Sequence, residues 1–240
     1  MSDASVAIIM PAGGSGSRFG ASQNKIFASL AAKPVWWHAV HTLCQTEHVH
    51  SLSIALSASD EKVFRDQLRE YGDGSVETPS IHGVRIRIVR GGEERYQSVQ
   101  AGLQGIQDDP KVDLVAVHDA ARPLLTTGDW HAVLAAAARS GAAMLATPLA
   151  GSLKRSLADG HNCRNVDRRD LWIALTPQVF KRDWIAQAYT RHRGFPVTDD
   201  AQLLEACGHP VELVRGSAAN LKITYPEDLR VAEAMLQNHG

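Results

Sequence analysis

Short apolar runs alternate with helix-like segments along most of this chain, and this alternation limits the possible folds more than any other feature. The apolar runs cover residues 6–10, 52–56, 84–89, 114–118 and 143–146, and the helical patterns cover residues 35–44, 61–71, 98–106 and 129–139. Strands that alternate with helices form parallel βαβ units. The sequence therefore predicts an α/β fold with a Rossmann-like, mostly parallel sheet and helices on both faces.

Length and charge narrow the class of protein further. The chain has 240 residues, and we expect residues 1–240 to form a single domain. Its 25 Lys and Arg residues nearly balance its 26 Asp and Glu residues, and no basic run stands out, so we expect no nucleic acid partner. No apolar run approaches the roughly 18 residues of a membrane span, so we expect no membrane association.

The cysteines indicate a compartment. Cys44, Cys163 and Cys207 are widely spaced and odd in number, which argues against a disulfide framework and against a zinc site. No signal-peptide pattern precedes the first predicted strand. We therefore expect a cytoplasmic protein.

A glycine-rich loop, residues 11–20, directly follows the first predicted strand. Glycine lets backbone N–H groups turn toward an anion and lets the anion come close. Arg18 and Lys25 add two cations just downstream. We predict a polyphosphate site at the carboxyl end of this strand, and the alternative is a tight strand-to-helix turn without a ligand.

Two common phosphate-binding fingerprints do not match this loop. In the dinucleotide pattern G-x-G-x-x-G, Gly14 and Gly16 fit, but Phe19 takes the third glycine position. The first acid after the second predicted strand, Asp60, comes too late to bind a ribose. The Walker pattern is absent too. A nicotinamide-dependent oxidoreductase is therefore a weak alternative.

Two further loops reach the same edge of the predicted sheet. Residues 91–95 follow the third strand and residues 118–123 follow the fourth. Ligands of such sheets bind outside the carboxyl ends of the strands. We therefore expect three polar or glycine-rich loops to converge on one site.

The alternating pattern breaks between residues 150 and 171. Asp159-Gly160 is a hairpin-turn signal between two short stretches of mixed polarity, which predicts a protruding β-hairpin arm. A two-stranded arm is marginally stable alone in water, so we expect it to pack on a second subunit. The alternative is a hairpin folded back on its own surface.

The last part of the chain returns to regular structure. We predict helices over residues 181–193 and 199–207, a strand over 211–214, and a strand or rim loop over 220–224. Pro226 opens the final helix, because proline suits the first helical position and the acids after it suit the positive end of the helix dipole.

A series of short motifs occurs in order over nearly the whole chain. They are residues 11–16 with Arg18, Lys25, residues 91–95 with Ser98, residues 117–123, 166–168 and 174–178, and residues 220–222 with 226–229. Together they make the chain similar to the 2-C-methyl-D-erythritol 4-phosphate cytidylyltransferase family of the non-mevalonate isoprenoid pathway. The resemblance implies a nucleotidyltransferase-type fold and a homodimer built through the arm.

The resemblance also implies a site that joins CTP to 2-C-methyl-D-erythritol 4-phosphate with release of pyrophosphate. The implied catalytic residues are Arg18, Lys25, Arg168 and Lys222. The implied substrate-binding residues are Ala12, Gly13, Gly14, Ser15, Gly16, Gly92, Glu93, Ser98, Asp119, Arg122, Ser152 and Thr176. Asp119 would help hold Mg²⁺, and Arg168 would reach the acceptor of the partner subunit.

Some positions depart from the family pattern. Asn24 and Ile26 flank Lys25 where the family usually has Pro and Gln, and Gly151 and Ala219 replace acids near the acceptor. One alternative is therefore a sister enzyme that uses ribitol 5-phosphate or another polyol phosphate. A separate, non-enzymatic alternative is a sugar-nucleotide sensor that kept the fold and lost the chemistry.

Overall fold

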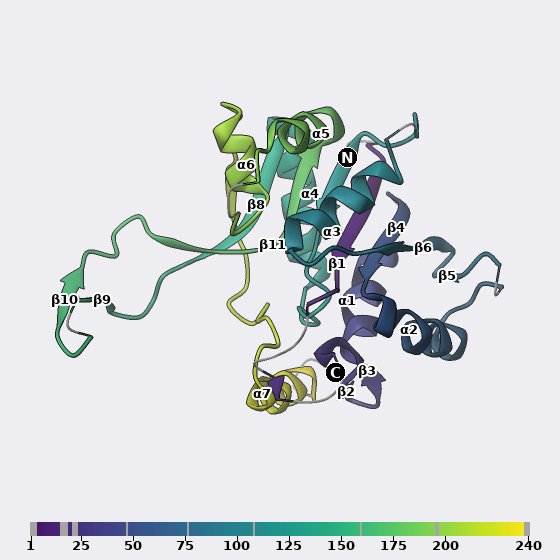
Figure 1. Cartoon of the computed structure of the whole chain (residues 1–240), viewed down its shortest axis with the longest axis horizontal. Helices are drawn as coiled ribbons and strands as arrows, with labels where there is room; N and C mark the ends of the chain where they lie inside the picture. Colours follow the sequence, from purple (N-terminus) through teal and green to yellow (C-terminus); the bar gives the residue numbers. More distant parts are fainter. Residues whose placement is uncertain are drawn as a thin grey trace.

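An eight-stranded sheet forms the centre of the fold, with the strand order β12-β8-β11-β7-β1-β4-β6-β5 (Figure 1). The computed structural model describes residues 4–14, 19–20, 24–46, 48–75, 77–107, 109–158, 160–194 and 197–237. The strands that share one direction are β1 (Val6–Pro11), β4 (Val49–Leu56), β6 (Val84–Arg90), β7 (Leu114–Val117), β8 (Ala142–Pro148) and β12 (Glu212–Arg215). Strands β11 (Trp172–Lys181) and β5 (Ser80–Ile81) run the other way. The predicted mostly parallel sheet is confirmed, although β11 and β5 were not predicted.

Helices cover both faces of the sheet, because the central strands are apolar on both sides. In β1, Val6, Ile8 and Met10 belong to one core, whereas Ala7 and Ile9 belong to the other. The first core is closed by α1 (Val35–Cys44), α2 (Ala58–Tyr71), α4 (Thr127–Ser140) and α7 (Pro226–Gln237). The second is closed by α3 (Arg95–Gln104), α5 (Arg182–Arg191) and α6 (Ala201–Ala206). Within the described part of the chain, none of these helices has the length and apolar character to cross a membrane.

Side-chain caps start the helices close to the carboxyl ends of the strands. Ser57 follows β4, and its Oγ accepts a hydrogen bond from the Asp60 backbone N–H (3.2 Å) at the start of α2. A capping box of Glu94 and Gln97 starts α3 just after β6. Each cap satisfies backbone donors that the first turn of a helix leaves free. The segments that lead into α2 and α3 lie beside the glycine-rich loop, since a Cβ on Gly13 would lie 3.6 Å from Ser57 N and 3.9 Å from Gly92 O.

The last helix lies beside the first loop of the chain. After the glycine-rich loop come the short helix η2 (Lys25–Phe27) and the two-residue strands β2 (Ser29–Leu30) and β3 (Lys33–Pro34). Helix α7 contacts β2, and Figure 1 shows the two next to each other. Residues 220–224, which lead into α7, form a loop and not a strand. This loop is tied to the sheet by a hydrogen bond from Ile223 N–H to Ala121 O (2.8 Å).

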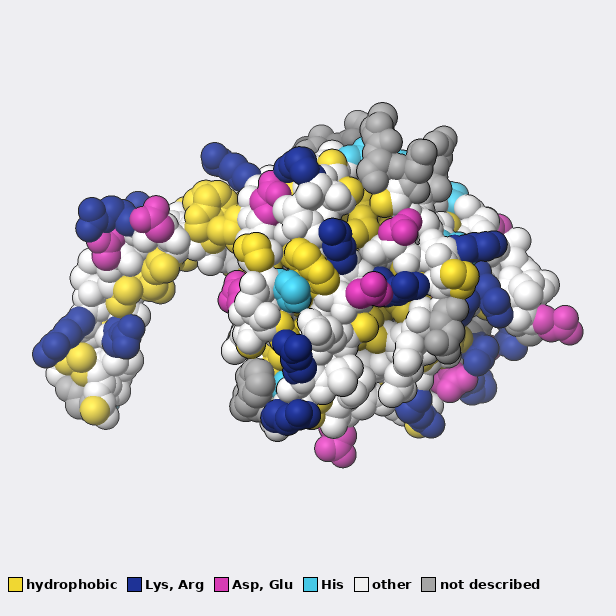
Figure 2. All heavy atoms as spheres, turned by 90° about the horizontal axis from the view of Figure 1, so that it is seen from above, with side chains coloured by type: hydrophobic (Ala, Val, Ile, Leu, Met, Phe, Trp, Pro, Cys, Tyr) yellow, Lys and Arg dark blue, Asp and Glu magenta, His cyan; other side chains and the backbone are white. Residues whose placement is uncertain are grey.

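The predicted hairpin arm is confirmed. Strands β9 (Leu153–Ser156) and β10 (Cys163–Val166) pair antiparallel and stand far from the main sheet (Figure 1). Gly160 in the turn has a φ of 72°, whereas Asp159 lies outside the described residues. Apolar side chains gather where the arm joins the body (Figure 2), and Leu171, Trp172 and Ile173 there are 40%, 39% and 46% exposed.

Candidate active site

A pocket of about 250 Å³ lies where β1, β6 and β7 end, at the edge that the sequence predicted. The lining residues come from the glycine loop, η2, the start of α3, the loop after β7 and the loop before α7. They are Pro11, Ala12, Gly13, Gly14, Asn24, Lys25, Ile26, Gly92, Glu93, Glu94, Arg95, Ser98, Asp119, Ala120, Ala121, Lys222 and Thr224. Segments near the two ends of the chain thus line the same cavity.

The loop after β6 needs glycine because it lies against the first turn of α3. A Cβ on Gly92 would lie 2.4 Å from the Gln97 Cβ, and one on Gly91 would lie 2.9 Å from the Ser98 Oγ. Real Cβ atoms do not approach so closely, so larger residues would push the loop away from α3. The two glycines therefore let Glu93 and buried Ser98 share one wall of the pocket.

Asp119 is the centre of the charged groups in the pocket. Its Oδ2 lies 3.0 Å from Lys222 Nζ and 3.5 Å from Arg122 Nε, and its Oδ1 lies 3.4 Å from Arg95 Nε. Burial would raise the pKa of the Asp119 carboxyl, but the three surrounding cations outweigh burial and hold that pKa well below its usual range. Asp119 is therefore ionised, and its carboxylate holds together cations from the start of α3, from its own loop and from the loop before α7.

Arg95 also pairs with a second carboxylate, that of the fully buried Asp200. Arg95 Nη2 donates to Asp200 Oδ2 (2.7 Å), and Tyr189 Oη donates to Asp200 Oδ1 (2.5 Å). Burial would lower the pKa of the Arg95 guanidinium, but Asp200 and Asp119 raise it. Gln178 Oε1 accepts from the backbone N–H groups of Asp200 (3.1 Å) and Ala201 (3.0 Å). Helices α5 and α6 thereby fix the guanidinium that faces Asp119.

The backbone of Asp119 is held by a buried network under the pocket. Its N–H donates to Thr176 Oγ1 (3.1 Å), and His118 Nε2 lies 3.2 Å from the carbonyl of Arg122. A carbonyl only accepts, so Nε2 carries the proton, and Nδ1 accepts from the Thr176 hydroxyl (3.1 Å). Burial lowers the pKa of the His118 imidazole to about 4. His118 is therefore neutral near pH 7 and acts as a support for the loop.

Arg122 is bound on both sides. Its Nη1 donates to the carbonyl of Asn220 (2.7 Å), and Asn220 Nδ2 donates to the carbonyl of Thr176 (2.8 Å). Both Asn220 and Thr176 are buried. The loop that carries Lys222 is therefore joined to the loop that carries Asp119 just below the pocket.

The predicted site residues fall into four groups. Those that line the pocket are Ala12, Gly13, Gly14, Lys25, Gly92, Glu93, Ser98, Asp119 and Lys222. Arg122 and Thr176 do not line it and lie behind Asp119. Ser152 and Arg168 lie on the arm, where they border a separate groove and Arg168 donates to the Ala150 carbonyl. Ser15, Gly16 and Arg18 lie outside the described residues.

Three residues that shape the site were not assigned a role from the sequence. Asn24 was noted only as a departure, and Arg95 only as part of a motif. Asp200 joins Arg95 across 105 positions of the chain. Nothing in the polar segment around Asp200 indicates that this acid will be buried. Only a motif that paired Asp200 with Arg95 could have shown its role from the sequence.

The fold and pocket define a class. A glycine-rich loop after the first strand of a mostly parallel sheet, with Lys25 and Lys222 both lining the pocket, is typical of an enzyme that transfers nucleotidyl groups. The comparisons with known proteins agree. The family model IspD, 2-C-methyl-D-erythritol 4-phosphate cytidylyltransferase, matches residues 6–238.

Individual relatives match over nearly the full length. A 2-C-methyl-D-erythritol 4-phosphate cytidylyltransferase of Rhodopirellula baltica is 48% identical and covers 97% of this chain and 95% of its own length. A crystal structure of a 4-diphosphocytidyl-2C-methyl-D-erythritol synthase from Anaerococcus prevotii has a TM-score of 0.81 at 26% identity and covers 98% of this chain and 100% of its own. The corresponding cytidylyltransferase structure from Thermus thermophilus has a TM-score of 0.72 at 30% identity and covers 98% of each chain.

This chain belongs to the 2-C-methyl-D-erythritol 4-phosphate cytidylyltransferase family. It is a nucleotidyltransferase of isoprenoid biosynthesis, and the predicted fold class, enzyme class and main function are confirmed. The names of the relatives support the methylerythritol phosphate acceptor and give no support to the ribitol 5-phosphate alternative.

Proposed function

We propose that this chain joins CTP and 2-C-methyl-D-erythritol 4-phosphate, giving 4-diphosphocytidyl-2-C-methyl-D-erythritol and pyrophosphate. The family match over residues 6–238 is the observation that carries this conclusion. In the reaction, an oxygen of the acceptor phosphate attacks the α-phosphorus of CTP. The bond between the α-phosphorus and the bridging oxygen breaks, and pyrophosphate leaves with the electron pair.

The chemistry needs cations and not a general base. A phosphate monoester has a second pKa of about 6, so the attacking oxygen is already largely deprotonated near pH 7. The remaining task is to hold two anions in line and to stabilise the charge that develops between them. Preorganised groups of this kind contribute on the order of 3 kcal/mol each. The ionised state of Asp119 and its cations suits this task, because their positions are set before substrate binds.

We assign the pocket residues to two substrates. Backbone N–H groups of residues 12–16 would contact the triphosphate, with Lys25 and Arg18 at the α-phosphate. Gly92, Glu93 and Ser98 would contact the cytidine. Lys222 would bind the acceptor phosphate, because its side chain is 40% exposed and faces the pocket while Asp119 orients it. Arg122 and Thr176 would act from behind, through Asp119.

Asp119 is also the residue that could help hold a divalent cation. Among the described residues, no group of three or more His, Cys, Asp or Glu side chains could form a metal cage. Mg²⁺ in nucleotide enzymes is commonly held by one or two carboxylates, substrate phosphates and water. A single ionised carboxylate beside a triphosphate pocket fits that mode. When bound, such a cation would neutralise phosphate charge.

The arm suggests a homodimer with a shared site. The exposed apolar residues where the arm joins the body, Leu171, Trp172 and Ile173, would be covered by a second copy of the chain. An isolated two-stranded hairpin also gains little stability alone. Arg168 and Ser152 lie on the arm, away from the pocket of their own chain, and we propose that they complete the acceptor site of the partner.

We also propose that the enzyme works in the cytoplasm. Cys44, Cys163 and Cys207 are free thiols, and free thiols are usual in a reducing compartment.

A pyrophosphate-release assay tests the reaction. The four common nucleoside triphosphates are each paired with 2-C-methyl-D-erythritol 4-phosphate and with ribitol 5-phosphate. We expect turnover with CTP and the methylerythritol phosphate. Gly151 and Ala219 replace acids that the family usually has near the acceptor. The comparison of the two acceptors is therefore a more demanding test than the comparison of the nucleotides. Faster turnover with ribitol 5-phosphate would refute the acceptor assignment.

Subunit mixing tests the shared site. Lys25→Ala and Arg168→Ala each damage both sites of a homodimer. A mixed dimer of the two variants contains one site with both native residues, so mixing should restore up to about half of the wild-type activity per mixed dimer. No recovery in a verified mixed dimer would place Arg168 and Lys25 in the same chain's site.

A further inference from the structure

Asn24 connects three segments next to the pocket. The residue is 8% exposed. The Nδ2 group donates to the carbonyl of Ala12 (2.8 Å) and to Asp60 Oδ2 (3.0 Å), and Oδ1 accepts from the Ile26 backbone N–H (3.3 Å). The amide thus uses both of its donors and its acceptor, which fixes its orientation. It ties η2 to the end of β1 and to the first turn of α2.

The residue after Asn24 is Lys25, which lines the pocket. Lys25 begins η2, a single turn whose closing bond runs from Ala28 N–H to the Lys25 carbonyl (3.1 Å). One such turn has little stability of its own. The position of the Lys25 backbone therefore depends on the anchor that precedes it.

Asp60 is itself held in place. Its backbone N–H is capped by Ser57 Oγ, and its carboxylate stands in the first turn of α2, where the helix dipole favours negative charge. A hydrogen bond to a carboxylate is stronger than one to a neutral acceptor. Asp60 thus gives Asn24 a fixed and strong acceptor on a rigid element.

We infer that Asn24 and Asp60 are positioning residues that set the distance from Lys25 to the reacting phosphates. The inference rests on the proposed role of Lys25 in the reaction. A long lysine side chain reaches a phosphate from many backbone positions, but in-line transfer accepts few of them. Loss of the anchor should therefore lower kcat more than it weakens binding of CTP.

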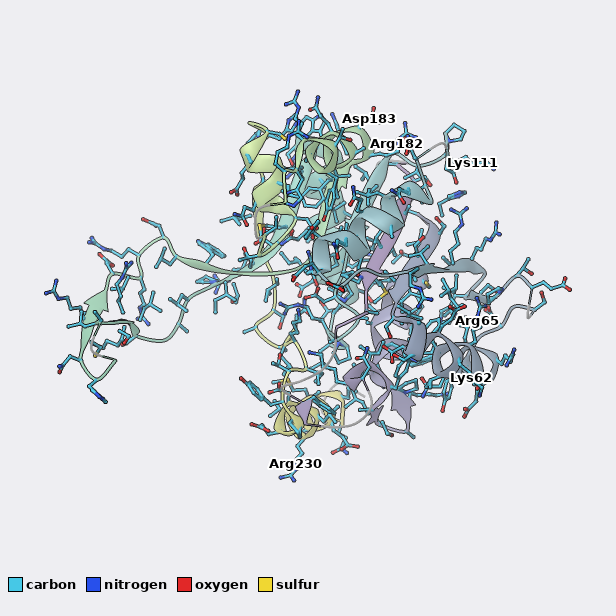
Figure 3. The ribbon with its side chains drawn as sticks, viewed as in Figure 1. Lys62, Arg65, Lys111, Arg182, Asp183 and Arg230 are labelled. Atoms are coloured by element: carbon cyan, nitrogen blue, oxygen red, sulfur yellow. The ribbon has the colours of Figure 1, made fainter. Side chains whose placement is uncertain are left out.

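The outer face of α2 supplies a matched control. Lys62 lies on that face (Figure 3), where its side chain is 88% exposed and its Nζ pairs with Asp66 Oδ2 (3.1 Å). Asp66 is an acid of the same helix, also engaged in a hydrogen bond, but it does not line the pocket. Asp66→Ala should leave kcat within about twofold of wild type, because an exposed pair contributes little.

The test compares Asn24→Ala and Asp60→Ala in the wild-type chain and in the Lys25→Ala chain. In the wild-type chain we expect each to lower kcat by about 10- to 100-fold, the scale of a misplacement near 1 Å. In the Lys25→Ala chain neither should lower kcat further, since the group they position is gone. The urea midpoint of each variant shows whether it folds. Asp60 is half-exposed, so Asp60→Ala still tests the inference if Asn24→Ala does not fold.

Two results would overturn the inference. One is an unchanged kcat in both folded variants. The other is an equal loss of kcat in the wild-type and Lys25→Ala chains, which would mean that Asn24 and Asp60 act independently of Lys25. A Lys25→Ala chain with wild-type kcat is a different failure, because it would refute the proposed role of Lys25 itself.

Discussion

Acidification should destabilise the fold through His118, and the size of the effect follows from its burial. Burial lowers the pKa of this imidazole from 6.5 to about 4 in the folded protein. The unfolded chain takes up a proton near pH 6.5, whereas the folded chain resists it until about pH 4. Between these values the unfolded state binds more protons, so stability falls as the pH falls.

The free energy of unfolding should fall by about 3 kcal/mol once the pH is below both pKa values of His118. Each tenfold difference in proton affinity between the folded and unfolded states contributes about 1.4 kcal/mol. Most of this loss should be present by about pH 4.5. Above about pH 7.5 the imidazole is neutral in both states, so it contributes no pH dependence there. Because His118 supports Asp119 through Thr176, the loop at the pocket should loosen as stability is lost.

Urea unfolding measures this directly. The free energy of unfolding is determined from about pH 7.5 down to about pH 4.5 for the wild type and for His118→Asn, which does not titrate in this range. The variant removes only one of the 11 histidines, so the difference between the two curves isolates His118. We expect the wild type to lose stability more steeply by about 2.5 kcal/mol over the range. Parallel curves would refute the reasoning.

Other perturbations test other parts of the structure. Lys222→Ala should raise the KM for the acceptor phosphate about 10- to 100-fold, because the variant loses one charge-assisted hydrogen bond to that phosphate. The KM for CTP should stay within about threefold of wild type. A change in the KM for CTP alone would contradict the assignment of Lys222 to the acceptor. Asp200→Ala leaves the buried guanidinium of Arg95 without the carboxylate that lies 2.7 Å away. Urea unfolding should therefore show that the free energy of unfolding falls by about 3–5 kcal/mol. A fall of less than about 1 kcal/mol would show that the fold does not depend on this ion pair. Burial raises the pKa of the Cys44 thiol to about 12. A thiol reagent should therefore label exposed Cys163 in the native protein and Cys44 only after denaturation. Labelling of Cys44 in the native protein would show that the core opens.

Local pattern was sufficient for most of the regular structure. The helix predicted at residues 35–44 has those bounds in the structure, and the strand predicted at 84–89 extends by one residue. Strand β11 was not predicted, because Pro177 interrupts it and proline argues against a central strand. It forms because β7 and β8 pair with it on both sides, with a register shift between Ala174 and Gln178 that accommodates the interruption.

The candidate site divides in the same way. The sequence alone determined that the glycine loop with Lys25 and the loop with Asp119 would meet at the carboxyl edge of a parallel sheet, because strand direction places such loops together. Lys222 was expected there only from the resemblance to the family. Only the tertiary structure decided that Asp200 faces Arg95, that Arg122 lies behind Asp119, and that Asn24 holds the turn of Lys25. Periodicity reports which face of an element is apolar, and it does not report which buried charges find each other. Those pairings depend on packing between segments far apart in the chain, where burial makes every unpaired charge costly.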